Sequence, residues 1–307
     1  MNRRTIITAA ALSLTALAVP AAAEAGTAPT RIVAHFDLAA GQMPENVVLD
    51  RAGGVAVTFA ASRQVARVSA GGAVTVLATL PAPADPSAAA PVLGFPLITG
   101  LVRDGRTYYV AYASGSGAET GIWRFTEGGV PRRLAALPGD GLPNGLAQDP
   151  RTGTLYVTDS VRGAVYEVSR QGRVTTFSTD PALAPATLLG ANGAKIHDNA
   201  LYVSNLDRGT VLRFPLRAAS RPTTVATGLT GIDDFTFTGR GDDFVAALIS
   251  TSEVVHVHHN RGTVLLTAAD GLSNPTSVAL RGRSLFVPSA AYLTQSDPNL
   301  LVTTLRH

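Results

Sequence analysis

One pattern occurs six times along the chain, and this repeat constrains the fold more than any other feature. Each copy has a small loop, one polar residue, an apolar run, a turn and a second apolar run. The copies begin in the segments PENVVLD, LITGLV, LPNGLAQ, GANGAKI, GIDDFTF and NPTSVAL. Their polar residues are Glu45, Thr99, Asn144, Asn192, Asp233 and Thr276, separated by 54, 45, 48, 41 and 43 residues. Four short strands in about 45 residues make one propeller blade, so the repeat predicts an all-β, six-bladed β-propeller with four antiparallel strands per blade.

The composition agrees with an all-β fold. The chain contains 30 Gly and 19 Pro, and short β-branched runs such as TLYVTD and ALYVSN recur between turn residues. The last copy is one strand short, whereas RIVAHFDL at 31–38 is a spare strand before the first copy. We therefore expect the strand at 31–38 to complete the sixth blade, because this pairing closes the ring and removes exposed sheet edges.

The first 25 residues differ in composition from the rest. MNRR is a basic start, TIITAAALSLTALAV is an apolar stretch too short to span a bilayer, and small-residue cleavage sites end at Ala23 and Ala25. This pattern predicts a secretory signal peptide at 1–25, a propeller over 26–307, and a protein secreted to the cell envelope or beyond. The pair Arg3-Arg4 leaves the export route open between the general secretory and twin-arginine systems. No later stretch is apolar enough to anchor the chain, so we expect no membrane span in the mature protein.

Charge and cysteine content narrow the classes of partner. The chain has no Cys, so an exported protein of this kind must depend on its hydrophobic core and not on disulfides. The net charge is +3, and the basic residues are nearly all Arg, dispersed along the chain. We therefore expect no nucleic-acid partner.

The six polar residues are candidates for a shared metal site. The innermost strand of each blade lines the central channel of a propeller, so residues that start these strands meet at one end of the channel. Asn before Gly is commonly a turn residue, and Asp at a strand start is commonly a cap, so each residue alone has a plainer explanation. Their common phase in the repeats favours a shared site. Carboxylate, amide and hydroxyl oxygens suit Ca²⁺ better than zinc, which prefers Cys and His.

Several of these segments resemble a known superfamily. PEN, PNGL, ANGAKI followed by LYVSN, and GIDDF are similar to motifs of the SMP-30/gluconolactonase/LRE-like six-bladed propellers. Diisopropyl fluorophosphatase, paraoxonase and the strictosidine synthase-like proteins are related to them. The resemblance implies that Glu45, Asn144, Asn192 and Asp233 bind Ca²⁺ or another divalent cation, with Asp233 as base or nucleophile. It also implies that Asp234 is a secondary ligand; gluconolactonases usually have Gly there, so the sugar-lactone substrate is not implied.

Other residues are expected to surround these ligands. Thr99 and Thr276 occupy the same position in the repeat as the four candidate ligands. The second strand of each blade should return to the same face, which places Thr158, Asp159, Ser204 and Asn205 beside Asn144 and Asn192. An alternative for Asp159 and Asn205 is that they open the next turn. The Pro/Ala-rich segment 81–96 could cover the site as a partial lid or serve as a linker.

Two principal functions fit these expectations. The first is a secreted Ca²⁺-dependent hydrolase, a monomer that acts on a lactone, ester or phosphoester as its small-molecule substrate. The second is a non-catalytic propeller with a structural ion, which binds a sugar, a peptide or a cell-envelope partner. They differ in access, because an enzyme needs an open coordination position with a pocket above it. A third, weaker alternative is a strictosidine synthase-like enzyme, which would not require the ion.

Overall fold

A computed structural model describes residues 28–51, 53–216 and 221–306. The predicted signal peptide at 1–25 lies outside these residues. Among the residues described, no helix is long and apolar enough to cross a membrane.

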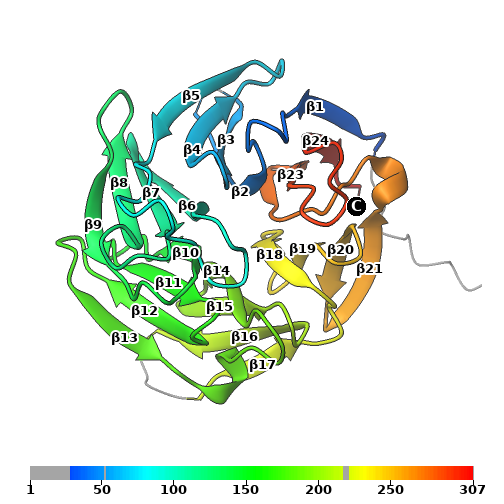
Figure 1. Cartoon of the computed structure of the whole chain (residues 1–307). Helices are drawn as coiled ribbons and strands as arrows, with labels where there is room; N and C mark the ends of the chain where they lie inside the picture. Colours follow the sequence, from blue (N-terminus) through cyan, green and yellow to red (C-terminus); the bar gives the residue numbers. More distant parts are fainter. Residues whose placement is uncertain (1–27, 52, 217–220, 307) are drawn as a thin grey trace, which may run out of the picture.

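The strands form six separate four-stranded antiparallel sheets arranged around one axis, so the predicted six-bladed propeller is confirmed (Figure 1). Blade one comprises β2 (Pro44–Leu49), β3 (Val55–Phe59), β4 (Gln64–Val68) and β5 (Val74–Thr79). Blade two comprises β6 (Leu97–Asp104), β7 (Thr107–Ala113), β8 (Gly121–Thr126) and β9 (Arg132–Ala136). Blade three comprises β10 (Pro143–Gln148), β11 (Leu155–Asp159), β12 (Ala164–Val168) and β13 (Val174–Ser178). Blade four comprises β14 (Ala191–His197), β15 (Ala200–Asn205), β16 (Thr210–Pro215) and β17 (Thr223–Ala226). Blade five comprises β18 (Ile232–Phe237), β19 (Phe244–Leu248), β20 (Glu253–His258) and β21 (Arg261–Leu266). Two short 3₁₀ helices, η1 (Pro181–Leu183) and η2 (Ala268–Asp270), lie in the connections.

The sixth blade joins the two ends of the chain. Its strands are ordered β1-β24-β23-β22, with β1 (Arg31–His35) outermost, followed inwards by β24 (Asn299–Thr304), β23 (Ser284–Ser289) and β22 (Ala279–Arg281). The first described strand, β1, pairs antiparallel with β24, and Figure 1 shows these two strands side by side in this blade. The expectation that the strand at 31–38 closes the ring is therefore confirmed.

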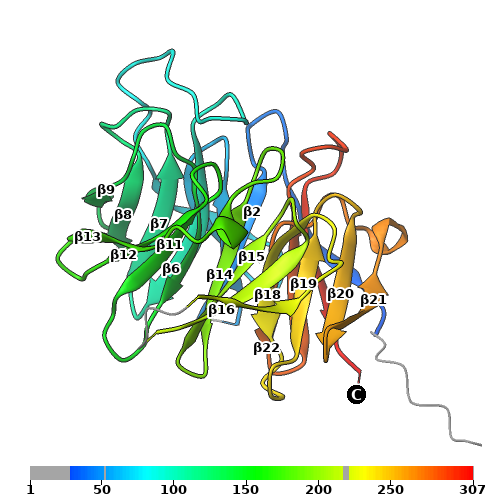
Figure 2. The same ribbon diagram turned by 90° about the horizontal axis from the view of Figure 1, so that it is seen from below.

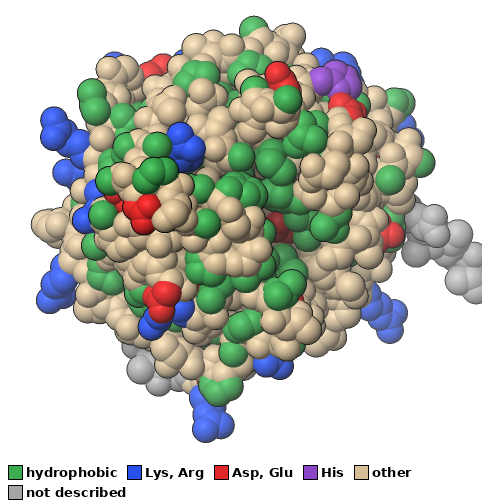
Figure 3. Space-filling model, in the orientation of Figure 1, with side chains coloured by type: hydrophobic (Ala, Val, Ile, Leu, Met, Phe, Trp, Pro, Cys, Tyr) green, Lys and Arg blue, Asp and Glu red, His purple; other side chains and the backbone are tan. Residues whose placement is uncertain are grey.

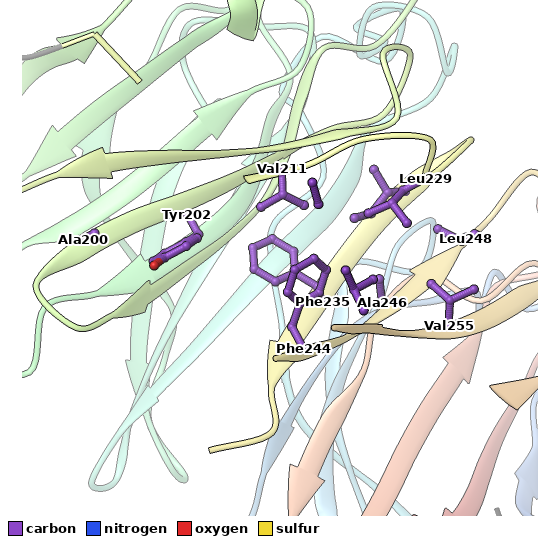
Figure 4. Packing of buried hydrophobic residues seen from close by; sticks show 12 residues of the cluster. Ala200, Tyr202, Val211, Leu229, Phe235, Phe244, Ala246, Leu248 and Val255 are labelled. Carbon is purple, nitrogen blue, oxygen red and sulfur yellow. The ribbon is translucent and has the colours of Figure 1, made fainter. Parts of the chain in front are cut away.

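The hydrophobic core lies between neighbouring blades. Figure 4 shows the contact of blades four and five, where Tyr202 and Val211 of one sheet pack against Phe235 and Phe244 of the next. Phe235 is fully buried, and burial of a Phe side chain stabilises the fold by about 2–3 kcal/mol. Middle strands have a blade on either face, so strands such as β11 and β19 are buried at every position. This explains why β19 (FVAAL) is a continuous apolar run and why β11 (LYVTD) has polar residues only at its end.

A β-bulge interrupts the innermost strand at the same point in five blades. The register shifts between Pro44 and Asn46 in β2, and equivalent shifts occur in β6, β10, β14 and β18. In each blade the shift spans the polar residue of the repeat. A bulge leaves its extra residue outside the ladder and redirects its side chain. The bulges therefore place the repeated polar residues where they can face the channel.

Candidate metal centre in the central channel

Six polar residues form an upper tier at one end of the channel. Their exposed fractions are 7% for Glu45, 0% for Thr99, 7% for Asn144, 2% for Asn192, 5% for Asp233 and 1% for Thr276. Figure 3 views this face, where hydrophobic side chains surround an acidic side chain at the centre. The predicted convergence of the polar residues thus corresponds to a buried polar site on the axis.

Glycine follows the polar residue in three blades because the neighbouring inner strand comes very close. A Cβ atom on Gly145 would lie 2.2 Å from the carbonyl oxygen of Asn192. One on Gly100 would lie 2.3 Å from the carbonyl oxygen of Asn144. The pair Asn144-Gly145 is therefore not a hairpin turn. The Gly allows two blades to approach, and the Asn supplies a side chain to the tier.

Thr99 and Thr276 bind backbone atoms of the neighbouring blades. The hydroxyl of Thr99 donates to the carbonyl of Pro143 at 2.8 Å, and Thr276 donates to the carbonyl of Pro44 at 2.8 Å. These carbonyls immediately precede Asn144 and Glu45. Both threonines are therefore placed to position a candidate ligand, as their predicted supporting role requires.

Hydroxyl groups of the second strands continue this inter-blade bonding. Thr158 accepts the N–H of Gly145 at 2.7 Å and donates to the carbonyl of Asn192. Ser204 accepts the N–H of Gly193 at 2.7 Å and donates to the carbonyl of Asp233 at 2.7 Å. Each hydroxyl thus ties the bulge of its own blade to the tier residue of the next blade.

A third hydroxyl orients the amide of Asn144. The Asn144 Nδ2 donates to Ser160 Oγ at 3.1 Å, and Ser160 donates in turn to the carbonyl of Ala191 at 2.7 Å. Since the serine proton is used by that carbonyl, Ser160 accepts from the amide nitrogen. The amide oxygen of Asn144 is consequently left free, as an ion ligand would require.

Glu45 has an unusual electrostatic environment. Burial, opposed by a hydrogen bond from Tyr292 and reinforced by the charge of Asp234, raises the pKa of Glu45 to about 7. The Tyr292 hydroxyl donates to Glu45 Oε2 at 2.7 Å. Burial and the adjacent Glu45 hold the pKa of Tyr292 well above its usual value of 10, so the phenol remains a donor. The loop after β23 therefore supplies a partner for Glu45.

Asp233 also ionises with difficulty. Burial, then the charge of Glu45 and the charge of Asp234, raise the pKa of Asp233 well above its usual range, while Lys195 opposes this shift. Among the described residues, no cationic side chain is hydrogen-bonded to Asp233 or Glu45. Two carboxylates thus lie buried near each other without a bonded counter-charge.

Asp234 belongs to a second tier, one residue deeper in the channel. Its carboxylate accepts hydrogen bonds from Lys195 Nζ at 2.6 and 2.7 Å and from Ser277 Oγ at 2.7 Å. Asn46 Nδ2 donates to the same carboxylate at 3.2 Å. Asn46, Asp234 and Ser277 each follow a tier residue directly, at the position that is Gly in three other blades. Because Lys195 already compensates the charge of Asp234, we assign Asp234 to this second tier and not to the ion ligands.

Asp159 and Asn205 do not contact the tier side chains. Asp159 Oδ1 accepts the N–H groups of Leu142, Val161 and Arg162 at 2.9, 3.2 and 3.0 Å. Asn205 donates to the carbonyls of Ala182 and Ala184 and accepts the N–H of Arg208. Each side chain bonds to its own following turn, as in the alternative in which it opens that turn. Each also bonds to the backbone of the connection before the inner strand of its blade.

The chemistry of the upper tier fits a hard cation. Glu45, Asn144, Asn192 and Asp233 offer carboxylate and amide oxygens, the donors that Ca²⁺ prefers. In the described part of the chain, no group of three or more His, Cys, Asp or Glu side chains is placed to hold a metal ion. That finding disfavours a zinc-type site, which would use such side chains. It does not bear on the upper tier, where only two of the four candidate ligands are acids and the other two are amides. The set would supply four of the six to eight oxygens that Ca²⁺ takes.

Apolar side chains enclose this end of the channel. Met43 and Leu142, which precede Glu45 and Asn144 by two residues, are buried in one cluster with Ala290. Leu93 and Phe95 of the segment 81–96 pack against the same cluster. The end of the segment, from Ala90 to Phe95, is therefore packed on this face as in a partial lid, whereas most of residues 81–89 are exposed.

The opposite end of the channel opens into a cavity of about 400 Å³. Residues of all six inner strands line it, including Asn46, Arg103, Gln148 and Lys195. Lys195 is also the partner of Asp234, so the second tier lies between this cavity and the upper tier. The two ends of the channel thus differ in chemistry: the upper tier contains two carboxylates, whereas the lining of the cavity is mainly apolar, with Arg103 and Lys195 as its charged residues.

Comparison with solved structures agrees with the fold. An aldose sugar dehydrogenase from Streptomyces coelicolor, solved with bound PQQ, is 14% identical over 93% of this chain and 99% of its own, with a TM-score of 0.66. A luciferin-regenerating enzyme is 13% identical over 91% and 95%, with a TM-score of 0.65. A structural-genomics protein, whose assignment as a gluconolactonase is provisional, is 14% identical over 93% of each chain, with a TM-score of 0.60. No family model and no curated protein matches the chain in sequence.

These similarities confirm the predicted resemblance at the level of the fold. The chain has the six-bladed architecture of the SMP-30/gluconolactonase/LRE-like propellers. Because one fold serves a sugar dehydrogenase as well as a provisional lactonase, the architecture alone does not select a reaction.

Several residues of the site were not identified from the sequence, namely Tyr292, Ser160 and Lys195 together with Asn46 and Ser277 of the second tier. Tyr292, Ser160 and Lys195 each bond to a tier residue of another strand or loop. Ser160 and Lys195 lie in repeated segments, and comparison of the repeats could have drawn attention to them. Tyr292 lies in a loop without a counterpart in the repeat, so no sequence signal identifies it.

Proposed function

We propose that this chain is an exported Ca²⁺-dependent hydrolase, which acts on a small lactone, ester or phosphoester in the upper tier. The ion would be held by Glu45, Asn144, Asn192 and Asp233. The observation that carries the proposal is the buried pair Glu45 and Asp233, since two adjacent carboxylates without a bonded cation are costly unless a metal neutralises them.

Two further observations support this assignment of ligands. The amide of Asn144 is oriented with its nitrogen towards Ser160, which leaves an oxygen available. Inter-blade hydrogen bonds from Thr99 and Thr276 fix the residues before Asn144 and Glu45. When surrounding hydrogen bonds already fix the ligand side chains, the site loses little conformational entropy on binding an ion.

When bound, the ion would polarise a carbonyl or phosphoryl oxygen of the substrate and lower the pKa of a water molecule. Asp233 would take the proton of the attacking water or attack the substrate itself. Without the ion, burial and then the charge of Glu45 raise the pKa of Asp233. A bound cation would favour the ionised carboxylate, the form that can accept a proton or attack. The apolar cluster around Met43 and Leu142 would limit the access of bulk water.

The runner-up is a non-catalytic propeller with a structural ion. It is favoured by the low exposure of the tier, where no side chain exceeds 7%. Both functions require the ion, and they differ in whether a substrate can reach it.

The test uses the mature chain from residue 26. We expect calcium to raise the melting temperature, and EDTA to abolish turnover of 4-nitrophenyl acetate and dihydrocoumarin. Asp233→Asn should reduce turnover by about 10²-fold or more. Asp104→Asn, which changes an exposed carboxylate at the end of β6, serves as the control. Turnover that survives both EDTA and Asp233→Asn would exclude the hydrolase, and calcium-induced stabilisation without any turnover would favour the runner-up.

A further inference from the structure

Tyr292 contacts the candidate metal centre from outside the repeat. Its hydroxyl donates to Glu45 Oε2 at 2.7 Å, a distance typical of a charge-assisted hydrogen bond. In the described residues, this is the one side-chain hydrogen bond that Glu45 makes. The second carboxylate oxygen, Oε1, has no such partner.

The loop that carries Tyr292 is fixed independently of Glu45. Asn274 Oδ1 accepts the N–H groups of Leu293 and Thr294 at 2.8 and 2.9 Å. Gln295 Nε2 donates to the carbonyl of Tyr292 at 2.7 Å. Ala291 adopts the left-handed conformation at φ 58°, which is uncommon for a residue other than Gly. The phenol is therefore presented to Glu45 by a braced loop and does not depend on that contact for its position.

Asn144 is held in a comparable way. Ser160 binds the amide nitrogen of Asn144 at 3.1 Å and leaves its oxygen free. Tyr292 binds one oxygen of Glu45 and leaves the other free. In both residues, an outer hydroxyl engages one polar atom of the side chain, so that a single oxygen remains for an ion.

We propose that Tyr292 is a positioning residue that restricts Glu45 to one oxygen ligand and thereby keeps a coordination position of the ion available to substrate. This inference rests on the proposed Ca²⁺ site. A carboxylate can bind Ca²⁺ through one oxygen or through both. If Glu45 used both oxygens, it would occupy a position that an enzyme needs to leave open.

The role predicts opposite effects on binding and on turnover. In Tyr292→Phe the ring is retained and the hydroxyl is lost, so Glu45 is free to use both oxygens. We expect the variant to bind Ca²⁺ at least as tightly as the wild type in calorimetry. Turnover of 4-nitrophenyl acetate at saturating Ca²⁺ should fall by about tenfold to a hundredfold, because the substrate competes with a second carboxylate oxygen.

A measurement without substrate tests the same point. Luminescence lifetimes of Eu³⁺ in H₂O and D₂O count the water molecules on the ion, and Tyr292→Phe should show one fewer than the wild type. Tyr202→Phe is the matched control, because the buried Tyr202 bonds to Asp242 and Arg213 and, within the described part of the chain, makes no hydrogen bond to the tier. Melting in EDTA shows whether each variant is folded.

A double variant keeps the inference falsifiable if Tyr292→Phe perturbs the loop. Glu45→Gln has only one side-chain oxygen, so adding Tyr292→Phe to it cannot supply a second ligand oxygen and should not lower the water count below that of Glu45→Gln. The inference is overturned if Tyr292→Phe alone leaves the water count unchanged, or if saturating Ca²⁺ restores its full turnover. A wild-type protein that binds neither ion overturns the proposed function together with this role, whereas wild-type binding with an unaltered variant overturns the role alone.

Discussion

Glu45→Gln should stabilise the ion-free protein at neutral and alkaline pH. Burial is the main reason that the pKa of Glu45 rises from 4.5 to about 7, and the charge of Asp234 adds to it. The native state thus binds the Glu45 proton more tightly than the unfolded chain does. The resulting stabilisation is present below pH 4.5 and is lost as the pH rises through 7. A displacement from 4.5 to about 7 corresponds to about 3 kcal/mol of unfolding free energy.

Urea denaturation in EDTA, followed by the fluorescence of the single tryptophan, Trp123, measures this effect. Near pH 4.5 the wild type and Glu45→Gln should have similar stability, because both side chains are neutral. At pH 8 the variant should be more stable by up to about 3 kcal/mol, the cost that the wild type incurs in ionising Glu45. The amide oxygen of Gln can still accept the hydrogen bond of Tyr292, so this contact is preserved.

Saturating calcium should reverse the order of stability. An ion at a thousand times its Kd stabilises the native state by about 4 kcal/mol, and the variant should gain less because it has lost a charged ligand. Asp104→Asn removes an exposed carboxylate at the end of β6, and its stability should match that of the wild type under all these conditions. The reasoning is refuted if Glu45→Gln loses the same stability between pH 4.5 and 8 in EDTA as the wild type.

Two other substitutions test the packing of the channel. Lys195→Met leaves the buried carboxylate of Asp234 without its cation, so the unfolding free energy measured in urea should fall by about 3 kcal/mol or more. The double variant Lys195→Met/Asp234→Asn should recover part of this loss. Equal stability of the single and double variants would contradict the role of this pair. Gly145→Ala brings a Cβ atom within 2.2 Å of the Asn192 carbonyl and should cost about 1–3 kcal/mol and weaken Ca²⁺ binding, whereas Gly117→Ala, with open space around it, should not. Equal effects of the two Gly substitutions would show that close approach of the blades is not the reason for Gly145.

The repeat in the sequence determined the architecture and the position of the upper tier. Each blade is a local unit of consecutive strands, so its pattern of apolar runs, turns and one polar residue is legible without tertiary information. The common phase of Glu45, Asn144, Asn192 and Asp233 predicted their convergence for the same reason. The spare strand at 31–38 could be placed because the sixth copy was one strand short.

The tertiary structure decided how each polar group is used. Asp233 and Asp234 are neighbours in sequence, yet the bulge places one in the upper tier and the other beside Lys195 in the second tier. Asp159 and Asn205 looked equivalent to supporting residues, but they bond to the backbone of their own turns and of the connection before the inner strand of their blade.

The same limit applies to contacts across the molecule. Tyr292 and Glu45 are 247 residues apart and meet because closure of the ring brings the sixth blade beside the first. Whether such a hydrogen bond forms depends on how two separate blades are placed, to within a few tenths of an ångström. The periodicity along one strand does not encode that placement. The sequence therefore determined which residues surround the axis, and the packing of the blades decided which of them carry uncompensated charge.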